Sequence, residues 1–230
     1  MSADADLSLR NVLDLILREY QTTGEQAATL EDLRSVHPHS IRQDNLADFC
    51  ELHNGETAEY DCFTFALDLI DCEERIAARE YAPSKIGPIQ RPGIADALPG
   101  PNFLQFLQLP KQTSFQDCHY YDLVVYYDKF GNAQHAGKIV AGMIVSKWGM
   151  KGALWQHGLW EVPSSYGTSM QFFSHRSREY VRQQWLKYLY KLAQRVMGFT
   201  YLISVMYENK GKNLNHEELL RLAAQKRARP

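Results

Sequence analysis

The sequence lacks the long apolar run that a membrane helix needs, since no stretch approaches about 20 consecutive apolar residues. It also lacks an excess of either charge: 25 Lys and Arg residues against 27 Asp and Glu residues give a net charge of -2. A near-neutral chain has no general attraction to nucleic acid or to an anionic membrane. We therefore expect neither a nucleic-acid partner nor a membrane role.

The N-terminal segment, MSADADLSLR, has acidic residues where a secretory signal peptide has positive charge. We therefore expect a cytoplasmic protein, or one that is exported by a route that reads no N-terminal signal. Cysteine is scarce, with four residues and no paired metal-ligand spacing. No metal and no cofactor are predicted, and without a signal peptide the cysteines are expected to be free thiols.

The composition that is present is typical of a globular protein, with 45% hydrophobic and 23% charged residues. Apolar residues at helical spacing predict a helix over Leu7–Tyr20. Further helices are predicted at Leu30–Val36, Ile41–His53 and Cys62–Arg79. Six prolines then interrupt residues 82–110, which predicts a long loop with one short helix at NFLQFLQ.

The middle of the chain has the pattern of an antiparallel sheet. YYDLVVYYD is rich in β-branched and aromatic residues, and turn residues separate it from AQHAGKIV, MIVSKWG and ALWQH. SMQFF predicts a further strand, and helices return after Ser174. This order indicates an α+β protein. We expect an N-terminal helical extension (1–55), a core (56–175) and a C-terminal helical extension (176–230), packed as a single compact unit.

Two residues within this pattern indicate chemistry. Cys62, in AEYDCFTFALDLID, is predicted to open a helix, where unpaired N–H groups and the helix dipole lower the pKa of a thiol. His135 begins a predicted strand, and the small residues after it leave room for another backbone or for a substrate. An imidazole beside the thiol would stabilise the thiolate and then protonate the leaving group. The other cysteines are expected in the core: Cys50, Cys72 and Cys118.

The pair Asp61–Cys62 at the start of a helix, followed by a strand that begins with HAG, resembles the NlpC-like branch of the papain-like cysteine peptidases. The resemblance covers Glu56 to about Gly167. It implies a papain-like fold, in which a helix that carries the cysteine packs on an antiparallel sheet. It also implies that Cys62 is the nucleophile, that His135 is the base, and that N–H groups near Cys62 bind the oxyanion.

In that family a polar residue on the next strand orients the histidine, and the sequence leaves this position open. Ser146, in VSKWG, and His157, in WQHGL, are the two alternatives. Asp61, Trp148 and Tyr166 are candidate substrate-binding residues. Trp148 and Tyr166 fit a substrate groove and a buried core of the sheet equally well.

The resemblance implies a thiol-dependent hydrolase of the amidase or peptidase type, which cleaves an amide or related acyl bond through a thioester. The substrate would be a cell-wall peptide or a protein target. The alternative is a non-catalytic protein-interaction module of the same fold, or another helical–β interaction protein, in which Cys62 is a core residue. The C-terminal helices are a candidate surface for a protein partner.

Overall fold

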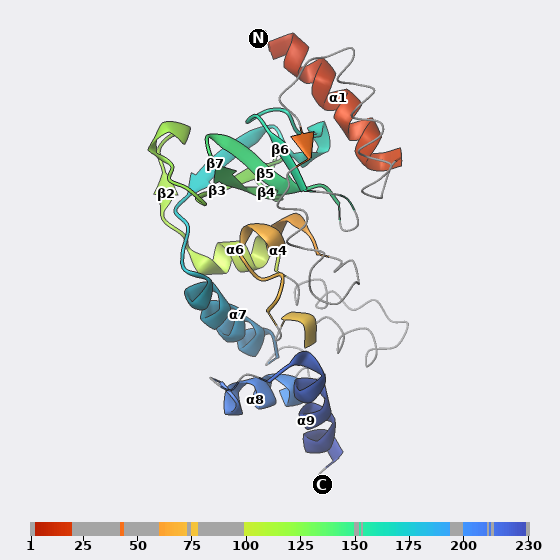
Figure 1. Ribbon diagram of the computed structural model, residues 1–230, viewed down its shortest axis with the longest axis vertical. Coiled ribbons are helices and arrows are strands. Elements are labelled where there is room, and N and C mark those ends of the chain that lie inside the picture. The colour runs from red at the N-terminus through yellow and green to blue at the C-terminus, as the bar shows by residue number, and fades with distance from the viewer. Residues whose placement is uncertain are drawn as a thin grey trace. The chain divides into compact units, whose positions relative to one another are not determined.

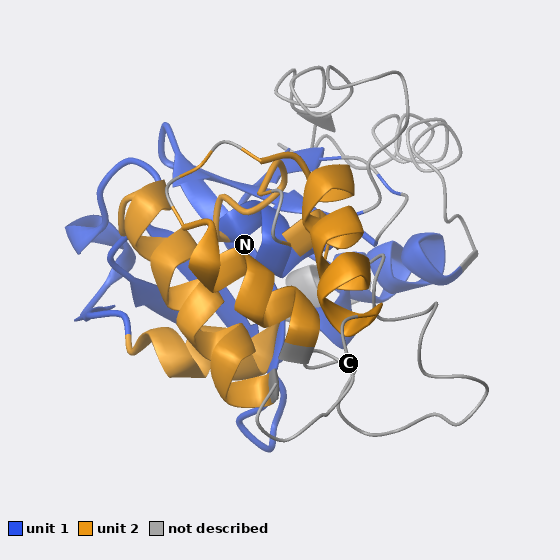
Figure 2. Ribbon diagram, turned by 90° about the horizontal axis from the view of Figure 1, so that it is seen from below, with its two compact units in different colours: residues 1–66, 109–175 blue, residues 67–108, 176–230 orange. Residues whose placement is uncertain are grey.

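The computed structural model describes residues 3–19, 42–43, 60–72, 75–77, 99–149, 152, 154–193, 200–210, 212 and 214–228. The chain divides into two compact units, coloured separately in Figure 2. The first unit comprises Met1–Ala66 and Leu109–His175, and the second comprises Leu67–Gln108 and Arg176–Pro230. The predicted helix at Leu30–Val36, the predicted core role of Cys50 and residues 82–98 of the predicted loop lie outside the described residues.

The described residues of the first unit include a seven-stranded antiparallel sheet, in the order β1-β6-β5-β4-β3-β7-β2 (Figure 1). The strands are β1 (Arg42–Gln43), β2 (Lys111–Gln112), β3 (Leu123–Tyr127), β4 (Ala133–Val140), β5 (Met143–Lys147), β6 (Leu154–His157) and β7 (Ser169–Phe173). Consecutive strands from β3 to β6 are neighbours, which confirms the predicted meander. The helix predicted at Ile41–His53 is wrong at its start, because Arg42 and Gln43 pair with β6.

Helix α1 (Ala3–Glu19) covers one face of this sheet, as its apolar stripe predicts (Figure 1). Leu9, Leu13 and Ile16 are buried in one hydrophobic cluster with side chains of the sheet. The sheet residues of that cluster are Val124, Tyr126, Ile139, Ile144, Trp148 and Trp155. They alternate along their strands, so they all point to the same face.

Helix α4 (Cys62–Ala66) packs on β4 and β5 from the opposite face (Figure 1). Asp61 caps this helix, because its Oδ1 accepts the backbone N–H of Thr64 at 2.7 Å. On the face that α4 covers, the Nζ of Lys138 lies 4.9 Å from the ring centroid of Phe65. The sheet therefore has a different helix on each side, and Cys62 is the first residue of α4.

The helix predicted over Cys62–Arg79 is wrong in length, because α4 ends at Ala66. Asp68 follows with a φ of 55°, and a left-handed residue stops the hydrogen-bond pattern of an α-helix. Cys72 therefore lies outside a helix, and its 3% exposure confirms its predicted place in the core. Cys118 is not in the core: it is half-buried, and its thiol donates to the carbonyl of Ser114 at 3.3 Å.

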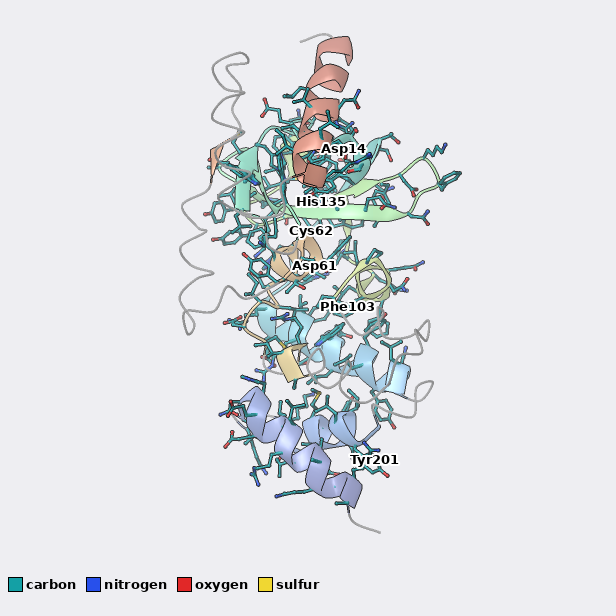
Figure 3. The ribbon with its side chains drawn as sticks, turned by 90° about the vertical axis from the view of Figure 1, so that its right-hand side faces the viewer. Asp14, Asp61, Cys62, Phe103, His135 and Tyr201 are labelled. Atoms are coloured by element: carbon teal, nitrogen blue, oxygen red, sulfur yellow. The ribbon has the colours of Figure 1, made fainter. Side chains whose placement is uncertain are left out.

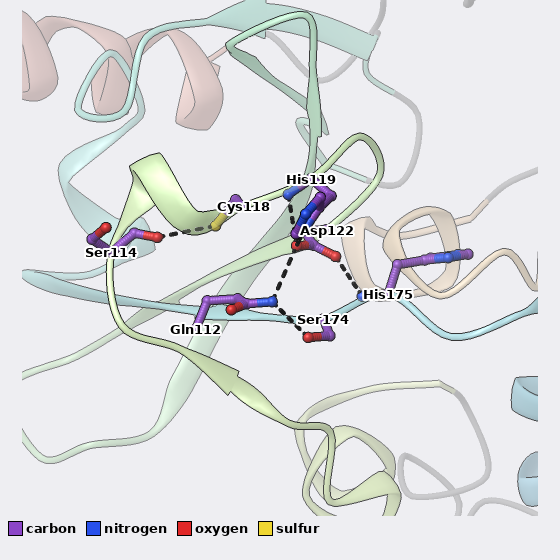
Figure 4. Close-up of polar contacts among 7 residues, drawn as sticks. All are labelled: Gln112, Ser114, Cys118, His119, Asp122, Ser174 and His175. Carbon is purple, nitrogen blue, oxygen red and sulfur yellow. Dashed lines mark hydrogen bonds and ion pairs between the residues drawn. The ribbon is translucent and has the colours of Figure 1, made fainter.

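A buried carboxylate, that of Asp122, holds the start of β3 in place (Figure 4). It accepts the backbone N–H groups of His119 at 2.8 Å and of His175 at 2.7 Å. The side-chain amide of Gln112, in β2, donates to Asp122 at 3.5 Å and to the hydroxyl of Ser174 at 2.7 Å. These bonds tie together β2 and the segments before β3 and after β7.

The described helices of the second unit include α6 (Pro101–Leu107), α7 (Arg178–Ala193), α8 (Thr200–Glu208) and α9 (His216–Ala228). The ring centroid of Phe103 lies 4.9 Å from that of Trp185 and 5.3 Å from that of Tyr188. At the start of α9, Asn215 and Glu218 accept each other's backbone N–H groups, so Asn215 is the N-cap of this helix. No described helix is long and apolar enough to cross a membrane.

Candidate active site

Cys62 is the first residue of α4 and lies against β4, the strand that carries His135 (Figure 3). The residue as a whole is half-buried, and its thiol hydrogen-bonds the backbone of Ala136, the residue after His135. The sequence separation of these residues is long, so only the packing of α4 on the sheet brings them together. The structure thus places the predicted nucleophile beside the start of the predicted strand.

The pKa of the Cys62 thiol is raised to about 12, so the predicted lowering of this pKa is wrong. Desolvation by burial is the largest cause, and the negative charge of Asp61 raises the pKa further. Hydrogen bonds from the backbone of Ala136 lower it by less. Since α4 has only five residues, few aligned peptide dipoles oppose these effects. The thiol is therefore protonated at neutral pH.

A β-bulge directly precedes His135 in β4. Tyr126 pairs with His135, whereas the next residue, Tyr127, pairs with Ala133, so that Gln134 is an extra residue on β4. A bulge changes the direction in which the following side chains point, and bulges are frequent next to active sites. Because His135 and Tyr126 are cross-strand partners, their side chains share the face of the sheet that α1 covers.

The imidazole of His135 is buried, with 1% exposure. Its ring stacks on that of Tyr166, with centroids 3.8 Å apart and 10° between the planes. Its Nε2 has no hydrogen-bond partner among the described residues. Burial and the positive charge of His157 hold the pKa of His135 well below its usual value. His135 is therefore a neutral imidazole, which is the form that can accept a proton.

The two candidates for the orienting residue, Ser146 and His157, are bonded to each other. The Oγ of Ser146 lies 2.8 Å from the Nε2 of His157, and the Nδ1 of His157 lies 2.7 Å from the carbonyl oxygen of Gly158. A carbonyl only accepts, so Nδ1 carries the proton and Ser146 donates to Nε2. Trp148 in turn donates its indole N–H to Ser146 at 3.1 Å. Within the described chain, none of these bonds reaches His135.

The structure places the three predicted substrate-binding residues in different settings. Asp61 caps α4. Trp148 is fully buried, so of the two interpretations the core of the sheet is correct for this residue and a substrate groove is not. Tyr166, in η3 (Ser164–Tyr166), is 9% exposed, and its phenol hydrogen-bonds the backbone of Gly149. Burial, followed by the charge of Cys62, raises the pKa of this phenol well above its usual value.

Two polar residues of α1, which sequence reasoning missed, hold the loop that carries Tyr166. The guanidinium of Arg10 donates to three backbone carbonyls, those of Val162 (3.2 Å), Pro163 (3.4 Å) and Gly167. Asp14 accepts the backbone N–H of Ser165 at 3.3 Å. Arg10 and Asp14 are both buried. The sequence could have indicated both residues, because they are four positions apart and lie beside the apolar stripe. This spacing places both on the side of the helix that faces the sheet.

Comparisons of the chain with protein-family models, with curated proteins and with solved structures found no match. The α+β class therefore stands on the observed elements and the antiparallel sheet. In the part of the chain that the structure describes, no group of three or more potential ligands could hold a metal ion.

Proposed function

We propose that the first unit has a papain-like, NlpC-like core and is a thiol-dependent hydrolase. Cys62 attacks an amide or related acyl bond of a cell-wall peptide or a protein target, and His135 is the base. One observation carries the proposal: the thiol of the half-buried Cys62 hydrogen-bonds Ala136, and the adjacent His135 is a buried, neutral imidazole whose Nε2 has no partner among the described residues. Asp61 supports it by fixing the start of α4.

The resting pair is neutral, because the pKa of Cys62 is raised to about 12 and that of His135 is well below its usual value. The sulfur attacks the acyl carbon while the imidazole takes the thiol proton. The carbon–nitrogen bond then breaks, the imidazolium returns the proton to the leaving amine, and a thioester remains on Cys62. Water, deprotonated by His135, hydrolyses the thioester and releases the acid. A positioned base of this kind contributes about 10²–10⁴-fold to the rate.

An acyl-transfer assay with p-nitrophenyl acetate tests the proposal. The wild-type protein should release a burst of nitrophenolate and carry an acetyl group on Cys62, located by mass spectrometry. Cys62→Ala should abolish the burst, and His135→Ala should slow acetylation of Cys62 by about 10²-fold, the lower end of the usual contribution of a general base. Cys118, which is also half-buried, is the internal reference. Equal acetylation of Cys62 and Cys118, unchanged in His135→Ala, would overturn the proposal.

A second candidate is a non-catalytic interaction module in which Cys62 contributes packing alone. The raised pKa of Cys62 favours it, and so does the burial of His135 on the face that α1 covers. Cys62→Ala separates the two functions. A catalytic cysteine should be removed with a loss of unfolding free energy below about 2 kcal/mol, whereas a packing cysteine should cost more than that and form no acyl adduct.

A further inference from the structure

Tyr166 contacts His135 directly and lies within electrostatic range of Cys62. Its ring stacks on the imidazole of His135, and its phenol is electrostatically coupled to the thiol of Cys62. We infer that Tyr166 is a positioning residue for proton transfer from Cys62 to His135, an inference that rests on the proposed function. In this arrangement a stacked ring holds the base, where the family resemblance implies a hydrogen bond.

No described hydrogen bond holds the imidazole in its plane. The Nε2 of His135 has no partner, and the Ser146–His157 pair is closed by its own bonds to Trp148 and Gly158. A parallel ring at 3.8 Å prevents the imidazole from turning out of its plane but leaves Nε2 free to exchange a proton. Tyr126 gives no equivalent restraint, because its ring is tilted by 42° at 5.8 Å.

Tyr166 is itself held on both sides. The phenol hydrogen-bonds the backbone of Gly149, and Arg10 binds the carbonyls of Pro163 and Gly167 around η3. Gly167 has a φ of 134°, and a Cβ at this position would lie 2.5 Å from the carbonyl oxygen of Tyr127, so glycine is required there. The ring is therefore fixed before a substrate arrives, as a positioning residue must be.

The phenol group is not essential to this role. Because burial raises its pKa, the phenol stays neutral and does not repel a sulfur that gains negative charge during attack. The stack needs an aromatic ring, and phenylalanine supplies one. Removal of the ring and removal of the hydroxyl should therefore have different effects on acetylation of Cys62.

The test measures acetylation of Cys62 by p-nitrophenyl acetate in Tyr166→Leu and Tyr166→Phe. Tyr166→Leu removes the stack and should slow acetylation by about 10-fold or more, as expected when a base loses its alignment. Tyr166→Phe keeps the stack, so its rate of acetylation should remain within about threefold of the wild-type rate. Tyr126→Leu is the matched control, because it removes the other buried tyrosine beside His135 without removing the stack. Circular dichroism and thermal unfolding identify any variant that fails to fold.

The double variant Tyr166→Leu/His135→Ala distinguishes positioning from general structural damage. If Tyr166 acts through His135, the double variant should be no slower than His135→Ala alone. The inference is overturned if His135→Ala slows acetylation of Cys62 while Tyr166→Leu leaves the rate at the wild-type value. It is also overturned if the loss of rate in the double variant is the product of the losses in the two single variants. The proposed function fails instead if His135→Ala equals wild type, a result that does not depend on Tyr166. If Tyr166→Leu does not fold, slow acetylation in the aromatic Tyr166→Phe variant overturns the inference.

Discussion

Ser146 and His157 share a buried hydrogen bond of 2.8 Å in which the serine is the donor and Nε2 of the histidine is the acceptor. The direction follows from Gly158, whose carbonyl fixes the proton on Nδ1. The Ser146 hydroxyl therefore donates one hydrogen bond, to His157, and accepts another, from the indole N–H of Trp148. This ordered chain joins β5 to β6.

Removal of the Ser146 hydroxyl should destabilise the first unit. Ser146→Ala removes two buried hydrogen bonds, to the Nε2 of His157 and from the indole N–H of Trp148, so the unfolding free energy should fall by about 1–3 kcal/mol. Urea unfolding, followed by tryptophan fluorescence, measures this change. Ser165→Ala is the control, because Ser165 is exposed and its loss should alter stability by less than about 0.5 kcal/mol. Equal stability of the two variants would contradict the hydrogen-bonded chain.

The stability of the first unit should decrease as the pH falls from 6.5 toward 4. Burial lowers the pKa of His157 to about 4, against an ordinary value of 6.5, while the bond to Gly158 and the charge of Glu161 oppose the shift. In this window the unfolded chain binds a proton that the folded chain does not, so the contribution is complete above pH 6.5 and is lost on acidification. The loss is about 3 kcal/mol at most. Burial also lowers the pKa of His135, so protonation of this histidine in the unfolded chain adds to the loss of stability on acidification.

Urea titrations at several pH values between 7.5 and 4.5 measure this dependence. His157→Gln removes the titrating group, so its unfolding free energy should vary less over this pH range than that of the wild type. Parallel curves for the two proteins would show that His157 is not the group that titrates.

The sequence predicted most of the helices and strands in which apolar residues recur at a regular spacing. The strands β4 and β7 have the predicted limits, because alternating residues and turn residues delimit them. The strand β1 could not be predicted, since two residues are too few to carry an alternation and its pairing with β6 is tertiary. The end of α4 was also missed, because apolar residues continue past Ala66 while the left-handed conformation of Asp68 stops the helix.

The sequence was sufficient to select Cys62 and His135 as candidate site residues, but it was not sufficient to predict the pKa of the thiol. The order of Cys62 and His135 along the chain was sufficient to propose that α4 and β4 meet, and the two elements do pack together. Burial outweighs the dipole of a five-residue helix, so the direction of the thiol pKa was wrong. The stack of Tyr166 on His135 depends on the bulge in β4 and on η3, neither of which leaves a periodic signal.

The two arginines of α1, Arg10 and Arg18, should differ sharply in their contribution to the free energy of unfolding. Arg10 is 8% exposed and donates to backbone carbonyls, so Arg10→Met should lower the unfolding free energy by about 3 kcal/mol. Arg18 pairs with Asp14 at 2.8 Å, but its side chain is 69% exposed, so Arg18→Met should cost less than about 1 kcal/mol. Urea unfolding measures both. If Arg18→Met is as destabilising as Arg10→Met, the carbonyl contacts of Arg10 are not what holds α1.

The thiol of Cys62 should react slowly with iodoacetamide at pH 8, because burial and the charge of Asp61 raise its pKa to about 12. Asp61→Asn removes that charge but keeps an oxygen that can accept the N–H of Thr64, so alkylation of Cys62 should become faster, by up to about tenfold for one pKa unit. Asp117→Asn is the reciprocal control: burial and the charge of Asp122 raise the pKa of Cys118 to about 11 and the charge of Asp117 adds to this, so this variant should accelerate alkylation of Cys118 and not of Cys62. Mass spectrometry of each alkylated cysteine follows the rates. The raised pKa would be contradicted if, in the wild type, Cys62 reacted faster than Cys118 and its alkylation rate reached half of its maximum below pH 8.5. That result would instead support the lowered thiol pKa that the sequence predicted.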